Sequence, residues 1–342
     1  MKRRTFIMTV GGAALGLSRL SAAAARNSGD LPRRTLGKAA FRMPAVGFPG
    51  LALSRYSQEE CNRAIPKAFN LGVNHFDVAP AYGDAEIKMG PALQGIPREK
   101  YFLSCKTKMR DAKGAQEELE RSLRRLRTDY FDLYQLHHLR RPEEVERALG
   151  PGGAMETILK AREEGKVRLI GFSAHTTKSA LLALKKFPFD TVMFPVNFVE
   201  MFKIGFGKPV VELAAARGTA VIAIKPIAAG AWKPGQKRNR PHWYPSLEEQ
   251  EQINMAMRFT LSQKAVVTAI PTSFLDLFEK AVAAGKVYRP ISPEETDQLR
   301  KIAAQSLSLF KREEDRVALS RPLPGPVHPG SPHEDEPGGL WA

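Results

Sequence analysis

Cysteine is scarce in this 342-residue chain, which contains only Cys61 and Cys105. Two thiols fall short of a cysteine-built iron–sulfur or zinc framework. Cys61 falls on an expected helix, and Cys105 precedes Lys106 on an expected strand, so we do not expect the two to pair. Near the C-terminus a few potential metal ligands occur together in the sequence, namely His328, His333, Glu334 and Asp335. They form no recognisable ligand motif, and we expect no metal site.

Three other features are also missing. No Gly-x-Gly-x-x-Gly motif follows the first expected strand, which excludes a Rossmann-type nucleotide site. No apolar run reaches the ~20 residues that span a bilayer, so the mature chain is not expected to insert stably into a membrane. Acidic residues are outnumbered, 36 against 52 Lys and Arg, for a net charge of +16. The bases accompany no nucleic-acid motif and do not alternate with aromatic residues, so we expect a solvated basic surface without a nucleic-acid partner.

The first 25 residues have the pattern of an export signal. A basic start with Arg3 and Arg4 leads into an apolar run, Met8 to Leu17, and then into small residues ending at Ala25. Such a pattern is typical of a cleaved signal peptide, and the paired arginines resemble a twin-arginine signal. We therefore expect the export machinery as a partner, cleavage near Ala25 and a periplasmic mature protein. An ordinary secretory signal or a membrane anchor is the alternative.

Three β-rich segments each end in a polar side chain. The first carries Asp77 and continues into a Pro/Gly turn with Tyr82, and the next two carry Lys106 and His137. The spacings of 29 and 31 residues between Asp77, Lys106 and His137 are each about one strand–helix repeat of a (β/α)₈ barrel, ~250 residues divided by eight. Consecutive strands of such a fold would place all four side chains at one rim.

These four residue types suit proton transfer to a carbonyl oxygen. The phenol of Tyr82 is a weak acid with an ordinary pKa near ~10, and a nearby buried Lys106 ammonium should lower that pKa. Asp77 would balance the charge of Lys106, and His137 would orient a carbonyl group. Taken singly, each residue also has a structural explanation: a helix cap for Asp77, an edge-strand lysine for Lys106 and a packed histidine for His137.

In this quartet, and in the stretch from Ser122 to His137 between its last two members, the chain resembles the aldo/keto reductases from about Arg34 to Ala284. The resemblance implies a nicotinamide cofactor, with Tyr82 as general acid and Asp77, Lys106 and His137 in support. It implies hydride transfer between nicotinamide and an aldehyde, ketone or alcohol. The expected export, rather than the resemblance, suggests a sugar-derived carbonyl as one candidate substrate. A regulatory or low-turnover barrel that binds nicotinamide and keeps the quartet is the alternative.

With this resemblance in view, the chain divides into one α/β domain and two tails. Eight expected strands alternate with helices, at residues 44–48, 76–79, 101–107, 130–138, 169–173, 191–197, 220–225 and 266–271. We expect a single (β/α)₈ TIM barrel over residues 33–311, with a short N-terminal hairpin at 33–43 and a last helix at 293–310. Residues 312–342, rich in Pro, Gly and acidic residues, should form an extended or disordered tail.

The cofactor side of the resemblance is divergent. Ser173 matches the family's carboxamide-binding set, whereas Ala174 and Met193 stand where the family has Asn and Gln. The segments around His175 and Lys225 resemble a branch of the family, some members of which carry an iron–sulfur tail that is absent here. We expect NADP or NAD, with NADP slightly favoured by the resemblance. The expected contacts are Ser173, His175, Asn197, Lys225, Pro226, Pro271, Thr272 and Ser273.

The longest insertion, residues 229–246, follows the seventh strand and carries several aromatic and basic side chains. Its position at the expected active rim is compatible with a lid over the cofactor or substrate. An exposed basic loop is the alternative.

Overall fold

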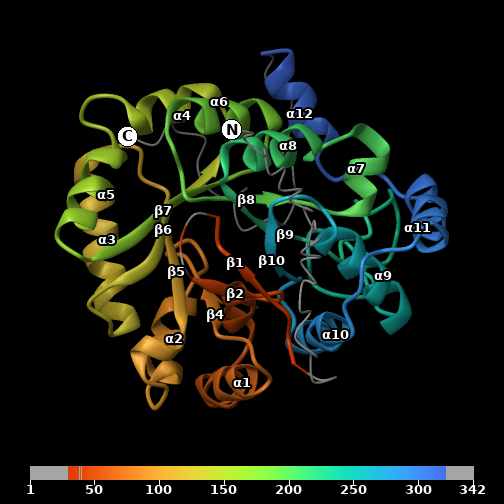
Figure 1. Ribbon diagram of the computed structural model, residues 1–342, viewed down its shortest axis with the longest axis horizontal. Helices are drawn as coiled ribbons and strands as arrows, with labels where there is room; N and C mark the ends of the chain where they lie inside the picture. The colour runs from red at the N-terminus through yellow and green to blue at the C-terminus, as the bar shows by residue number, and fades with distance from the viewer. Residues whose placement is uncertain (1–29, 38, 40, 321–342) are drawn as a thin grey trace, which may run out of the picture.

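The computed structural model describes residues 30–37, 39 and 41–320. The expected signal peptide, at residues 1–25, and residues 321–342 of the expected tail lie outside the described residues. Figure 1 shows a ring of helices around a central barrel of strands.

Eight parallel strands form the barrel, and each pairs with the next in sequence order. They are β3 (Phe48–Pro49), β4 (His75–Asp77), β5 (Phe102–Thr107), β6 (Phe131–Leu139), β7 (Val167–Ala174), β8 (Thr191–Pro195), β9 (Ala220–Ile224) and β10 (Val266–Ile270). A parallel bridge between Val46 and Ala269 joins the first strand segment to the last. Hydrogen bonds from Gly47 N to Ala269 O (3.0 Å) and from Ala269 N to Ala45 O (2.9 Å) complete the contact. The predicted (β/α)₈ barrel is confirmed, with each strand close to its expected position.

The antiparallel hairpin of β1 (Arg33–Thr35) and β2 (Arg42–Pro44) lies at the N-terminal end of the barrel. Leu36 and Met43 are buried there in one cluster with Phe102 and Ala220, the first residues of β5 and β9. The hairpin predicted at residues 33–43 therefore covers the end of the barrel opposite to the strand ends that carry the chemistry.

Helices connect the strands on the outside. They are α1 (Gln58–Asn70), α2 (Ala85–Leu93), α3 (Ala112–Leu126), α4 (Pro142–Leu149), α5 (Ala154–Glu163), α6 (Thr177–Lys186), α7 (Phe198–Ile204), α8 (Lys208–Arg217), α9 (Gln250–Leu261) and α10 (Leu275–Lys286), with 3₁₀ turns η1 (Gly50–Arg55) and η2 (Arg98–Lys100). Local sequence sets their ends and faces. Ser57 and Glu60 form a capping box at the start of α1, which satisfies backbone N–H groups that a helix start otherwise leaves unpaired. The amphipathic α3 buries Leu119, Leu123 and Leu126 against the barrel.

The C-terminal segment differs from the prediction. Helix α11 (Pro293–Gln305) ends before Phe310, and Lys311–Ala318 form a further helix, α12, where an extended tail was expected from residue 312. Two acidic residues of α12 have partners in the rest of the chain: Glu313 pairs with Arg140 (2.6 Å) and Glu314 accepts a hydrogen bond from the Thr177 backbone N–H (2.7 Å). These contacts attach α12 to the barrel, next to α6.

Both cysteines are buried free thiols. Over the described ranges, no helix is long and apolar enough to cross a bilayer. Within those ranges, too, no cluster of three or more His, Cys, Asp or Glu side chains is arranged to hold a metal ion.

Candidate active site

The barrel brings the four predicted catalytic side chains together. Asp77 is the last residue of β4, Tyr82 lies in the turn that follows, and Lys106 and His137 lie in β5 and β6. The Lys106 Nζ donates to Asp77 Oδ2 at 2.6 Å and to the Val78 carbonyl at 3.1 Å. It lies 4.9 Å from the centroid of the Tyr82 ring. The Tyr82 and His137 rings meet edge to face at 5.6 Å.

A cavity of about 70 Å³ opens beside this quartet. Asp77, Tyr82 and His137 line one part of it. Its other lining residues come from the ends of β3, β9 and β10, from the loop after β7 and from the long insertion: Pro49, Gly50, Leu51, His175, Ile224, Lys225, His242, Trp243, Tyr244, Ile270, Pro271 and Ser273. The site thus lies at the C-terminal ends of the strands, where parallel barrels carry their chemistry.

Burial controls the electrostatics of the quartet. It raises the pKa of the Tyr82 phenol; the Lys106 ammonium opposes this, but the pKa stays above its ordinary value. Lys106 lowers the pKa of Tyr82 as expected, but desolvation outweighs this attraction, so the expectation of a net downward shift was wrong. Burial also lowers the pKa of Lys106, but the charge of Asp77 and the Tyr82 oxygen more than reverse this. At neutral pH the pair is thus a neutral phenol beside a charged ammonium.

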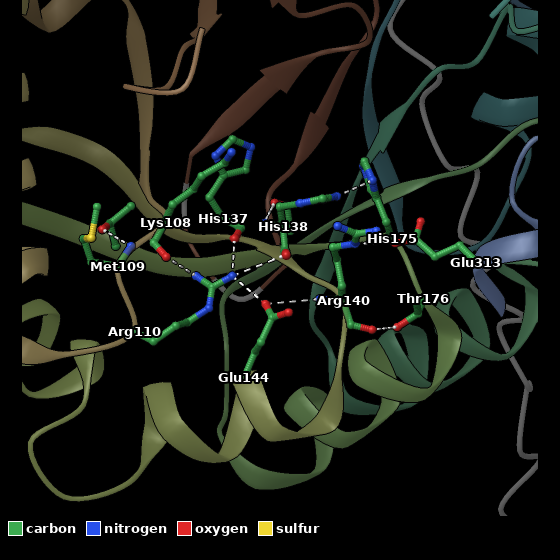
Figure 2. Close-up of polar contacts among 12 residues, drawn as sticks. Lys108, Met109, Arg110, His137, His138, Arg140, Glu144, His175, Thr176 and Glu313 are labelled. Atoms are coloured by element: carbon green, nitrogen blue, oxygen red, sulfur yellow. Dashed lines mark hydrogen bonds and ion pairs between the residues drawn. The ribbon is translucent and has the colours of Figure 1, made fainter. Parts of the chain in front are cut away.

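A bulge in β6 gives two consecutive histidines different directions. The register with β7 shifts between Leu136 and Leu139, and His138 has φ of 58°. Figure 2 shows His137 and His138 pointing apart, with His138 directed toward His175. Such bulges are over-represented beside active sites because they re-aim side chains.

Arg110 stabilises this bulge by hydrogen bonds to its backbone. Its guanidinium donates to the His137 carbonyl at 2.8 Å and to the Glu144 carboxylate at 2.8 Å, with a longer bond to the His138 carbonyl at 3.3 Å (Figure 2). Arg110 is almost fully buried. Sequence reasoning missed both His138 and Arg110, since a bulge and its support depend on strand pairing that has no local signature.

The expected cofactor residues are only partly brought together. His175, Lys225, Pro271 and Ser273 line the cavity, whereas Ser173, Asn197, Pro226 and Thr272 do not. Ser173 Oγ accepts from the His138 backbone N–H at 2.7 Å, Asn197 Oδ1 caps α7 at the Glu200 N–H (3.0 Å), and Thr272 Oγ1 lies 2.8 Å from Ser246 Oγ.

The insertion at residues 229–246, here called the strap, covers the cavity. His242, Trp243 and Tyr244 are buried and line it, while residues 233–239 are exposed. Backbone bridges at Ala228–Ser246 and Ala231–Leu307 fix its two ends. The insertion was interpreted either as a lid over the site or as an exposed basic loop, and its position agrees with a cover over the site.

The C-terminal segment also reaches the site, which the sequence did not indicate. The Phe310 ring lies 5.5 Å from the His175 ring and stacks on Phe206 at 4.8 Å. The apolar pair Leu309–Phe310, just ahead of a charged helix, was the one local signal that this segment is anchored.

Comparison with known proteins agrees with this geometry. The model of the aldo/keto reductase family matches residues 45–304. The chain belongs to the aldo/keto reductase family. Family members are oxidoreductases, and the family chemistry is the NAD(P)-dependent interconversion of carbonyl compounds and alcohols.

Individual relatives are distant. L-galactose dehydrogenase of Arabidopsis thaliana is 25% identical over 247 residues, which cover 65% of this chain and 73% of the relative. An NAD/NADP-dependent indole-3-acetaldehyde reductase of Schizosaccharomyces pombe is 33% identical over 195 residues, 54% of this chain and 66% of the relative. A Mycobacterium avium aldo-keto reductase is 35% identical over 140 residues, so this chain spans only 46% of that relative.

Among solved structures, an aldo-keto reductase of Bacillus halodurans in its holo form superposes with a TM-score of 0.65 at 21% identity. The match covers 81% of this chain and 98% of that one. At this identity the likeness supports the fold alone.

Proposed function

We propose that this aldo/keto reductase reduces an aldehyde or ketone with NADPH or NADH, with Tyr82 as the general acid. The reverse reaction, oxidation of an alcohol, would use the same residues. The observation that carries the proposal is the buried Lys106 ammonium, placed between the Asp77 carboxylate and the Tyr82 ring, with His137 against that ring at the cavity wall.

The cavity has a side chain that suits a nicotinamide dinucleotide chemically, but its volume in this structure is too small to hold one. Lys225 is a buried lysine in the wall and could donate a hydrogen bond to an oxygen atom of the cofactor. A volume of about 70 Å³ is far below the ~300–1,000 Å³ of a typical small-molecule site. His242, Trp243 and Tyr244 of the strap would therefore have to move aside for a dinucleotide to enter.

Residues of the chain would supply the proton and control its transfer. A bound reduced nicotinamide would supply the hydride to the carbonyl carbon. The Tyr82 phenol would donate its proton to the carbonyl oxygen, and the Lys106 ammonium would stabilise the phenolate that remains. Asp77 keeps Lys106 charged in the buried site. His137 would hold the carbonyl oxygen in line by a hydrogen bond.

Replacement of Tyr82 by phenylalanine tests this role. Loss of the acid should reduce kcat by about 10²–10⁴-fold, while dinucleotide affinity stays near that of the wild type. Tyr130→Phe is a matched control, because Tyr130 precedes β6 at the opposite end of the barrel. Unchanged turnover in Tyr82→Phe would refute the assignment.

A second candidate is a barrel that binds nicotinamide and turns over little. The departure from the family's carboxamide set, together with the narrow cavity, favours it. Titration with NADP and NAD separates the two functions, since a regulator binds the dinucleotide without sustained consumption in the presence of any carbonyl.

We also propose that the protein is exported through the twin-arginine route and carries its cofactor with it, because free nicotinamide is not expected outside the cytoplasm. Recycling of the bound cofactor in place would then need two substrates in turn: a carbonyl, such as a sugar-derived one, that is reduced, and an alcohol whose oxidation returns the hydride to the cofactor. Mass spectrometry of small molecules released on denaturing the protein isolated from its native compartment tests this. Stoichiometric NADP or NAD is the expected result and would identify the preferred dinucleotide, whereas an empty site would count against loading before export.

A further inference from the structure

Lys225 holds an unusual position at the end of β9. It follows the last strand residue, Ile224, with φ of 60°. A residue with a Cβ rarely occupies this left-handed region, and such strained positions cluster at functional sites. The side chain is buried and lines the same cavity as Tyr82 and His137.

The groups that face the Lys225 ammonium come from four elements. His175, after β7, lies nearest, with Nε2 at 3.3 Å. The rings of Trp243 in the strap and of Phe310 before α12 lie 5.4 and 5.7 Å away. Two further titratable groups act on Lys225 or are acted on by it through their charge: His242 of the strap and Glu313 of α12.

No carboxylate of the described chain lies within ion-pair distance of Lys225. Glu313, the acid that acts on it from α12, pairs instead with Arg140 at 2.6 Å. Lys106, the other buried lysine at the cavity, has Asp77 as a partner. A buried ammonium without an anion is unfavourable, and the missing charge can be supplied by a ligand.

A histidine chain fixes the position of Lys225. His175 Nδ1 lies 2.8 Å from His138 Nε2, which extends the contact back to the bulge in β6 (Figure 2). If the charged Lys225 donates to His175 Nε2, then His175 Nδ1–H donates to His138 Nε2. This order leaves the remaining hydrogens of the ammonium available to a ligand in the cavity.

We propose that Lys225, supported by His175, forms a subsite for an oxyanion in the wall of the cavity, and that the ligand held beside Tyr82 carries a carboxylate or a phosphate. The two sources are a carboxylate on the substrate and a phosphate of the dinucleotide, and their shared chemistry is a set of charged oxygen acceptors. The proposal rests on the proposed function and extends it by naming a charged group on the ligand. The anion subsite itself can be tested without any turnover.

The protonation of Lys225 supports this assignment and predicts the direction in which anion affinity changes with pH. Burial lowers the pKa of Lys225 to about 7, and Glu313 opposes this only in part. An anion beside the ammonium would raise the pKa again, so binding should be accompanied by proton uptake above pH 7. Affinity for the anion should therefore fall as the pH rises from 7 to 9.

Equilibrium binding of small probes to the purified protein tests the subsite. Inorganic phosphate, acetate and the neutral isostere acetamide are titrated while tryptophan fluorescence is followed, because the Trp243 ring lies 5.4 Å from the Lys225 Nζ. Phosphate and acetate should bind and acetamide should not. Lys225→Met should weaken anion binding by at least about tenfold, as expected for loss of a charge-assisted hydrogen bond. Methionine keeps a Cβ and a similar length, so the backbone strain is unchanged.

Two variants serve as controls. Lys225→Arg keeps the cation and should restore most of the affinity. Lys108→Met removes another buried lysine at the end of β5 that does not line the cavity, and it should bind anions as the wild type does. Equal binding of acetate and acetamide, wild-type affinity in Lys225→Met, or an affinity that does not change between pH 6 and 9 would each overturn the proposal.

A second pair of measurements identifies the source of the anion. If Lys225→Met weakens NADP or NAD binding, the subsite serves the cofactor phosphate. If instead it raises the KM for 4-formylbenzoate but not for the methyl ester of that compound, the subsite serves a substrate carboxylate. Anion binding through Lys225 in a protein that reduces no carbonyl would refute the proposed reaction and leave the subsite standing. Carbonyl reduction that depends on Tyr82, in a protein that binds no anion through Lys225, would refute the subsite and leave the proposed reaction standing.

Discussion

Replacing Lys106 by methionine should destabilise the protein in a way that depends on pH. Lys106 and Asp77 are 0% and 5% exposed at their side chains and are joined at 2.6 Å. The second carboxylate oxygen of Asp77 is buried without a hydrogen-bond partner in the described part of the chain. Removing Lys106 leaves that carboxylate buried and uncompensated, which costs about 3–5 kcal/mol of the free energy of unfolding.

The pH dependence follows from the proton that the variant would take up. Burial already raises the pKa of Asp77 against the opposing charge of Lys106. With Lys106 gone, the pKa of Asp77 in the folded protein should lie still further above the value of ~3.9 in the unfolded chain. Between these two values the folded state binds more protons than the unfolded state. The free energy of unfolding therefore falls as pH rises, by about 1.4 kcal/mol per pH unit. The cost of the substitution should therefore be smaller at acid pH than at neutral pH.

Urea denaturation followed by circular dichroism, at intervals from pH 4 to 8, measures this. The double variant Asp77→Asn/Lys106→Met lacks the titrating carboxyl, so its difference from the wild type should vary much less with pH. Lys67→Met is the control for loss of an exposed pair, because Lys67 and Glu279 are 59% and 43% exposed, and it should cost less than about 1 kcal/mol. An equal loss at pH 4.5 and 7.5 in Lys106→Met would refute the reasoning, as would a double variant that keeps the same pH dependence.

Three further outcomes are expected. Since the pKa of Tyr82 is raised, carbonyl reduction should be insensitive to this group from pH 6 to 9, whereas alcohol oxidation, which needs the phenolate, should rise with pH; initial rates in both directions measure this. Gly50→Ala should destabilise the protein and reduce turnover, because its Cβ would lie 2.1 Å from the Asp77 carbonyl oxygen; thermal unfolding and kcat measure both effects. Replacing Arg3 and Arg4 by lysines should leave the precursor in the cytoplasm, which cell fractionation would detect, and normal export of that variant would contradict a twin-arginine signal.

The parts of the site that sequence reasoning found are those set by the barrel repeat. Asp77, Lys106 and His137 follow one another at about one strand–helix unit, and parallel strands of one barrel carry their C-terminal ends to the same rim. The repeat length therefore determines that these side chains are neighbours, whatever the helices between them contain. Tyr82 follows from Asp77 through a short turn.

Other parts depend on contacts between distant segments. The sign of the Tyr82 pKa shift depends on how much water the surrounding segments exclude, which no local pattern reports. The bulge at His138 depends on how β6 pairs with β7. Likewise, the attachment of α12 depends on Arg140 and the Thr177 N–H, which lie opposite Glu313 and Glu314 and are far from them in the sequence.

The two buried lysines near the cavity differ in the group that balances their charge. Lys106 has its counter-charge in Asp77, so its ammonium is fixed by folding and is ready before any ligand arrives. Lys225 has a histidine and aromatic rings but no anion, so its charge is balanced only when a ligand brings one. An anion that binds there should stabilise the folded protein by about 2.7 kcal/mol at a hundred times its Kd. The first lysine is thus suited to catalysis, in which the charge must be preorganised, and the second to recognition, in which the unfavourable burial of an unpaired charge is relieved only by the correct ligand.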